Sequence, residues 1–160
     1  MDDFAKRILN DVNPDEIAPT RKPRPLVDHW PPAVLLERAA YLRKLARYGN
    51  GFASEIIKEF PHYSVALSFL GRSGDTEVHH GHSCIFHVLA GTATLLTGGT
   101  VLRPRSAGTG EVAGTSIEGG ETQGIRQGDV IHVPPGVAHQ ILVAGDKSIT
   151  LLIVKVQESK

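Results

Sequence analysis

The chain has 160 residues, and 17 basic side chains balance 17 acidic ones, so its formal net charge at pH 7 is zero. This length suits one domain with an ordinary hydrophobic core. Because the charges balance, the chain exerts no net attraction on nucleic acid or on an anionic membrane. We therefore expect neither of these partners.

Cysteine content and the absence of long apolar runs indicate the compartment. Cys84 is the only cysteine, so no internal disulfide can form and nothing favours an oxidising compartment. No apolar run reaches the roughly 18 residues that a membrane span needs. The acidic start, MDDFAKRILN, lacks the apolar centre of a signal peptide. These features predict a cytoplasmic protein.

Residues 1–51 are expected to form an arm and a helix that pack on the rest of the protein. A short amphipathic segment at the start is followed by the proline-rich stretch NPDEIAPTRKPRPLVDHWPP, which is unlikely to hold regular structure. A helix is predicted from Pro31, because proline suits a first helical turn. Its apolar residues recur at helical spacing up to Gly49, namely Leu35, Ala39, Leu42 and either Leu45 or Ala46.

Residues 52–160 are expected to form an all-β domain. The runs YSVALSFL, CIFHVLAGTATLL, DVIHVPPGVAHQILVA and SITLLIVKV have strand length and are separated by turn-forming residues. Residues 98–128 look like a long excursion between strands, and TSIEGGETQGI is predicted to form a hairpin within it. Strand spacing alone does not distinguish a sandwich from a barrel.

A motif near the end of the chain favours the barrel over the sandwich. In GDVIHVPPGVAHQ, the residues Gly128, Pro134, Gly136 and His139 follow the spacing G(X)5PXG(X)2H, which resembles the second motif of the cupin superfamily. The prolines and glycine predict a rigid turn that returns His139 into a strand. The resemblance implies a cupin-type double-stranded β-helix, or jelly-roll barrel, with an N-terminal helical extension.

The stretch EVHHGHSCIFHVLAG, residues 77–91, resembles the first cupin motif, but the family's glutamate is missing. In one regular strand, alternation places one set of side chains inside the barrel, namely His80, His82, Cys84, Phe86 and Val88. His80 and His82 would then face inward, with Cys84 near the position of the missing acid. In the alternative, His79 is the first ligand, and a bulge at Gly81 lets His82 act as the second.

The resemblance implies a metal site made by His80, His82 and His139, with His79 or Cys84 as a disputed further member. Buried imidazoles repel one another when protonated, so a neutral, metal-binding state is natural. We expect one divalent transition metal per chain, chosen from Fe, Mn, Ni, Zn and Cu. A thiolate ligand would favour Zn or Cu, although Cys84 is explained more simply as a buried apolar residue.

Other candidate side chains are expected to have ordinary roles. Glu77 is expected at the surface, with the orienting of an imidazole as the alternative. Four histidines are interpreted as packing or surface residues, namely His29, His62, His87 and His132.

The resemblance implies a metal-dependent enzyme acting on a small oxygenated organic molecule by dioxygenase, isomerase, lyase or cyclase chemistry. The alternative is a cupin that binds or senses a small ligand without catalysis. The sequence singles out no catalytic residue. Inward aliphatic side chains favour an apolar or aromatic ligand, with walls formed by Val88, Leu95, Ile131 and Leu151. Cupin barrels commonly pair, so we expect a homodimer.

Overall fold

The structure, a computed structural model, describes residues 27–159. The amphipathic start and most of the proline-rich arm lie outside these residues. From Pro31 onward the chain forms one compact unit. Its elements in chain order are α3 (Pro32–Tyr48), β1 (Phe52–Glu59), β2 (Tyr63–Leu70), β3 (Thr76–His79), β4 (His82–Thr97), β5 (Thr100–Leu102), β6 (Arg105–Gly108), β7 (Glu111–Gly114), β8 (Ser116–Glu118), β9 (Glu121–Arg126), β10 (Val130–Val133), β11 (His139–Leu142) and β12 (Ile149–Gln157).

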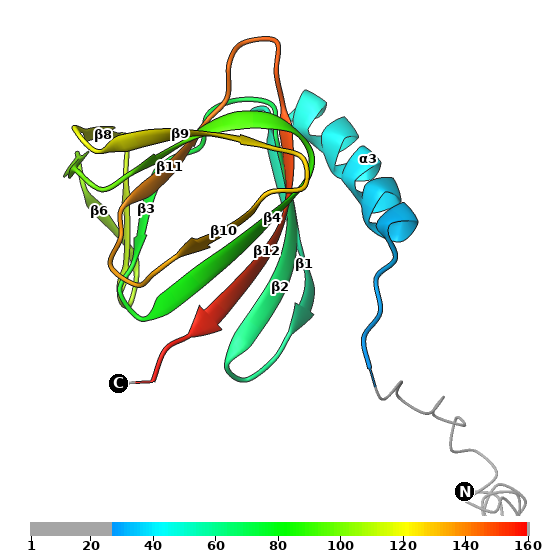
Figure 1. Ribbon diagram of the computed structural model, residues 1–160, viewed down its shortest axis with the longest axis horizontal. Coiled ribbons are helices and arrows are strands. Elements are labelled where there is room, and N and C mark those ends of the chain that lie inside the picture. Colours follow the sequence, from blue (N-terminus) through cyan, green and yellow to red (C-terminus); the bar gives the residue numbers. More distant parts are fainter. Residues whose placement is uncertain (1–26, 160) are drawn as a thin grey trace, which may run out of the picture. The chain divides into compact units, whose positions relative to one another are not determined.

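The strands form a curled antiparallel sheet with two walls (Figure 1). The first, here called the β12 wall, contains β1, β2, β12, the first half of β4, and β10. The second, here called the β3 wall, contains β9, the second half of β4, β11, β3, β7 and β6. The expected all-β barrel with an N-terminal helix is therefore confirmed.

Strand β4 belongs to both walls because it bends at Gly91. Gly91 pairs with Ile149 and has a φ of 83°, in the left-handed region that favours glycine. A Cβ atom at this position would lie 2.0 Å from the carbonyl oxygen of Ser148. Only glycine therefore fits where the strand crosses from the β12 wall to the β3 wall.

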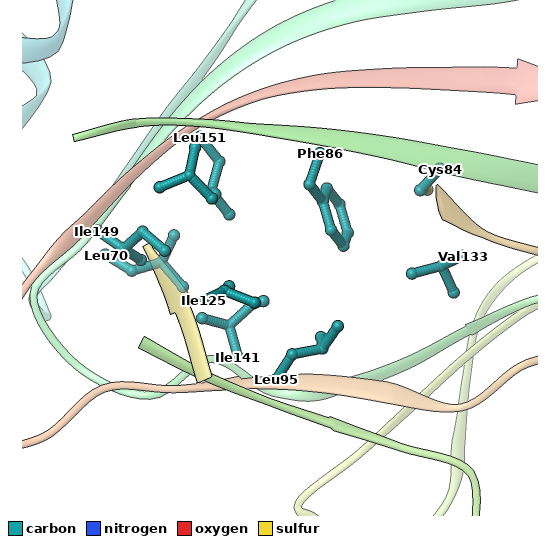
Figure 2. Close-up of a cluster of buried hydrophobic side chains, with 10 residues drawn as sticks. Leu70, Cys84, Phe86, Leu95, Ile125, Val133, Ile141, Ile149 and Leu151 are labelled. Atoms are coloured by element: carbon teal, nitrogen blue, oxygen red, sulfur yellow. The ribbon is translucent and has the colours of Figure 1, made fainter. Parts of the chain in front are cut away.

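The core lies between the walls, where alternate side chains of facing strands meet (Figure 2). It consists of Leu70, Cys84, Phe86, Val88, Leu95, Ile125, Val133, Ile141, Ile149 and Leu151. Cys84, Phe86 and Val88 alternate along β4 with exposed residues, as a strand buried on one face requires. Burial of these side chains is the main force that holds the two walls together.

Helix α3 covers the outer face of β1 and β2. It begins after Pro31, and the backbone N–H of Gly49 ends it by donating to the carbonyls of Leu45 and Ala46. The predicted apolar stripe is confirmed, and it contains Ala46, which is 2% exposed, rather than Leu45, which is 44% exposed. Within the described residues, no helix is long and apolar enough to cross a membrane.

The excursion between β4 and β10 differs from the prediction. Strands β8 and β9, which span the expected hairpin, do not pair with each other, since β8 pairs with β5 and β9 pairs with β4. The predicted hairpin is therefore wrong. The Gly119–Gly120 turn has positive φ angles, which let the chain pass from one sheet to the other. The β5–β8 sheet instead packs on the outer face of β3, where Ile117 contacts Val78 and Ala138 in a second apolar cluster.

Candidate metal centre

Neighbouring strands of the β3 wall bring three potential metal ligands together. Glu77 and His79 lie on β3, and His139 opens β11. One potential ligand atom from each of these side chains lies within 4.8 Å of the others. Glu77 and His79 are two positions apart, so their side chains share the inner face of β3. His139 is the direct cross-strand partner of Glu77.

The turn after β10 fixes the orientation of His139. Gly136 has a φ of 78°, and its N–H donates to the carbonyl of His79 at 2.8 Å, which ties the turn to the end of β3. Nδ1 of His139 donates to the carbonyl of Val137 at 3.0 Å. Its Nε2 is therefore unprotonated in the neutral ring, is buried, and has no hydrogen-bond partner. A buried polar atom without a partner is rare, and here its lone pair faces the other ligands.

His79 is held from the opposite side by a carboxylate. Its Nδ1 is hydrogen-bonded to Oε2 of Glu111 on β7, and its Nε2 lies 3.6 Å from Oε2 of Glu77. The second oxygen of Glu111 accepts a hydrogen bond of 2.9 Å from Nζ of Lys155 on β12. Lys155 therefore links the β12 wall to the site on the β3 wall.

The pKa values of His79 and His139 are shifted in opposite directions from the ordinary value of histidine. Burial lowers the pKa of His79, but its interactions with Cys84, Glu77 and Glu111 outweigh burial and raise its pKa to about 10. Burial lowers the pKa of His139 below its ordinary value. The neighbouring imidazole of His79 lowers the pKa of Glu77. At neutral pH, without metal, the cluster therefore pairs a charged His79 with ionised Glu77 and a neutral His139.

The cluster lies in the wall of a cavity of about 470 Å³ inside the barrel. Apolar side chains from both walls line much of it, namely Phe52, Ala66, Leu70, Cys84, Phe86, Ile141, Leu151 and Ile153. The polar lining includes the metal-ligand candidates, Lys155, and the hydrogen-bonded pair Ser54 and Ser68. This volume accommodates a small organic molecule beside the cluster.

The sequence-predicted site residues divide into two groups. His79 and His139 belong to the cluster, whereas His80 is exposed in the turn between β3 and β4. Nδ1 of His82 lies 3.4 Å from Oε1 of Glu111, beside the cluster rather than within it. The expectation of one continuous strand is wrong here, because β3 ends at His79 and β4 begins at His82. The alternation of inward and outward side chains that is expected for a single strand is therefore interrupted at residues 80–81.

Cys84 faces the cavity from the opposite wall. It is 3% exposed, and its thiol contributes to raising the pKa of His79. The remaining histidines have exposed side chains, as expected for His29, His62, His87 and His132. Of the side chains predicted to line the pocket, Leu151 does so, whereas Val88 and Leu95 fill the core and Ile131 packs against it.

The sequence assigned neither acidic residue of the cluster's surroundings to the metal ligands. Glu77 is exposed, as expected, with 56% of its side chain accessible, but it also lines the cavity beside His79. A signal was present, because Glu77 and His79 are two residues apart on a predicted strand. Glu111 lies in the excursion, and no local pattern connected it to His79.

The donor set fits a divalent transition metal. Two imidazole nitrogens and one carboxylate oxygen match the ligand types that Fe, Mn, Ni, Zn and Cu accept in proteins. Histidines at metal sites often carry a carboxylate on their second nitrogen, and His79 is hydrogen-bonded to Glu111 in this way.

No protein-family model and no curated protein sequence matches the chain. Among solved structures, TT1209 from Thermus thermophilus is 19% identical over 74% of this chain and 95% of that chain, with a TM-score of 0.50. A cupin protein from Bacteroides fragilis is 18% identical over 63% and 70%, with a TM-score of 0.46. Pac13 from Streptomyces, solved with uridine, is 12% identical over 70% and 74%, with a TM-score of 0.49.

The topology defines the class of protein. Two antiparallel walls curl around an apolar interior, and the β10–β11 turn carries the cupin-like spacing of residues 128–139. The chain has a curled antiparallel barrel fold, which it shares with TT1209.

Proposed function

We propose that the protein is a metal-dependent cupin enzyme that acts on a small oxygenated organic molecule. In this proposal Glu77, His79 and His139 hold one divalent transition metal. The observation that carries the proposal is the bare Nε2 of His139, which is buried without a partner and faces two further donor atoms. A metal ion would satisfy this atom and offset the cost of burying it.

When bound, the metal would act as a Lewis acid toward a substrate oxygen. The protein's own residues supply the surroundings. Phe86, Leu151 and Ile153 give the cavity an apolar lining, which strengthens electrostatic interactions beside it. Lys155 carries a positive charge on the same cavity wall, where it stabilises negative charge on Glu111. The choice among dioxygenase, isomerase, lyase and cyclase chemistry depends on the substrate.

Metal content of the purified, untagged protein tests this proposal. We expect about one equivalent of metal per chain in the wild type, and loss of that metal in His139→Ala. The matched control is His132→Ala, which removes an exposed imidazole from β10 and should leave metal content unchanged. A wild type that takes up none of the five metals after reconstitution would contradict the proposal.

A second candidate function is ligand binding without metal. The observation in its favour is the charge balance of the metal-free cluster, in which a protonated His79 lies between Glu77 and Glu111. Turnover of a small-molecule extract, followed by mass spectrometry, separates the two functions. An enzyme depletes a compound and forms a product, and His139→Ala abolishes both changes. A binding protein retains a compound unchanged, and His139→Ala still retains it.

We further propose that the protein acts in the cytoplasm as a homodimer. Its lone cysteine is buried and free, and one flank of α3 presents Val34, Tyr41 and Leu45, each nearly half exposed. Such apolar exposure is consistent with a partner surface. Light scattering tests the proposal, and a monomeric mass would contradict it.

A further inference from the structure

Glu111 is the least expected residue near the metal centre, because it lies in the excursion rather than in either cupin-like motif. It is the direct cross-strand partner of His79 in the β3–β7 ladder, and its Oε2 is hydrogen-bonded to Nδ1 of His79. Its side chain is 19% exposed and that of His79 is 12% exposed, so water competes only weakly for this bond.

This bond determines which ring nitrogen is available to a metal. A carboxylate accepts hydrogen bonds, so it selects the ring form of His79 that carries its proton on Nδ1. When the charged ring loses its other proton, the lone pair forms on Nε2, the nitrogen that faces Glu77. The neutral ring of His139 also carries its proton on Nδ1, because the carbonyl of Val137 accepts the Nδ1–H. Both histidines thus present Nε2 to the common centre.

Lys155 holds Glu111 in place from the facing wall. Its Nζ donates to Oε1 of Glu111 at 2.9 Å, which leaves Oε2 for His79. Nδ1 of His82 also lies 3.4 Å from Oε1. The carboxylate is therefore held by hydrogen bonds from β12 and β3.

We propose that Glu111 is a positioning residue of the metal centre, which orients His79 for coordination through Nε2 and is itself held by Lys155. This inference rests on the proposed metal-binding function. It predicts that the chain's metal affinity depends on a residue that does not coordinate the metal. Orienting groups of this kind typically change metal affinity by about 10- to 100-fold.

The test measures the zinc dissociation constant of the full chain by competition with a chromophoric chelator. Glu111→Ala should weaken zinc binding by about 10- to 100-fold. Glu111→Gln should restore most of the affinity, because its amide oxygen still accepts the Nδ1–H. Lys155→Met should weaken binding by a smaller factor. The matched control, Glu118→Gln, changes an exposed glutamate on β8 and should have no effect.

A second readout separates positioning from a general loss of structure. In the zinc-loaded, 15N-histidine-labelled protein, the Nδ1–H of His79 should give an exchange-protected proton signal that disappears in Glu111→Ala, while circular dichroism stays unchanged. An unchanged dissociation constant in Glu111→Ala, or a signal that persists in it, would overturn the inference. A wild type that binds no zinc or other metal would instead contradict the metal centre itself.

Discussion

His139 and Glu77 face each other directly across the β11–β3 ladder, and Nε2 of His139 lies 3.8 Å from Oε2 of Glu77. The backbone register that creates this contact depends on the rigid turn before β11. A mutation of either side chain therefore changes the metal centre without changing the ladder that positions it.

Glu77→Gln should weaken metal binding by at least about 100-fold, since it removes a ligand charge and leaves a poorer donor. The fold should be retained, because the side chain opens into the cavity and contributes nothing to the apolar core. Inductively coupled plasma mass spectrometry of the purified variant checks metal content. Glu121→Gln, an exposed site on β9, serves as the control. Equal metal content in both variants would remove Glu77 from the proposed ligand set.

Metal binding should release about one proton per site near pH 7.5, because ligands must be deprotonated to coordinate. The pKa of about 10 means that His79 is charged at this pH in the metal-free protein. His139 and Glu77 have lowered pKa values and contribute no proton. Affinity should therefore fall about tenfold for each unit that the pH falls below 10.

Calorimetric titration in two buffers of different ionisation enthalpy measures this proton release. The apparent binding enthalpy should vary with the buffer, with a slope of about one proton per metal. A binding enthalpy that is the same in both buffers would show that His79 is neutral before metal arrives.

Leu42→Ala in α3 should lower the free energy of unfolding by roughly 2–5 kcal/mol, because Leu42 is 1% exposed against β2. Leu45→Ala, one turn along the same helix and 44% exposed, should change it by less than about 1 kcal/mol. Urea denaturation of both variants measures the difference. Similar costs for the two substitutions would mean that the helix does not pack on the barrel in the way described.

Gly91→Ala should destabilise the protein by about 3 kcal/mol or more, since a positive φ and a clash with Ser148 act together. Gly124→Ala in β9 provides the comparison, because no atom lies within 4 Å of a Cβ atom there, and its cost should stay within about 1 kcal/mol. Thermal unfolding followed by circular dichroism distinguishes the two. A mild effect at Gly91 would mean that β4 can bend elsewhere.

The barrel and its helix could be predicted from sequence because their signals are local. Helical spacing identified the buried stripe of α3, and the motif around Gly136 identified the turn that delivers His139. The same local patterns did not reveal where the predicted strand is interrupted. The alternation predicted across His79, His80 and His82 is wrong because the strand is interrupted, and the turn at residues 80–81 shifts the phase of the alternation.

The partners of the histidines could not be predicted, because they depend on pairing between strands far apart in the chain. Glu111 is 32 residues from His79 and Lys155 is 44 residues from Glu111. Neither contact has a sequence pattern of its own. Both follow from the order of strands, in which β7 pairs with β3 and β12 belongs to the facing wall.

The two walls of the barrel contribute different parts of the candidate site. All the proposed metal ligands and Glu111 come from adjacent strands of the β3 wall, β11, β3 and β7, while β1, β2 and β12 contribute much of the cavity lining. Substitutions on the β12 wall can therefore reshape the space available to a substrate while the metal ligands keep their register. Such a barrel could acquire a new substrate through mutations on one wall alone, and Lys155 and Cys84 are positions on that wall where a mutation would also reach the metal centre.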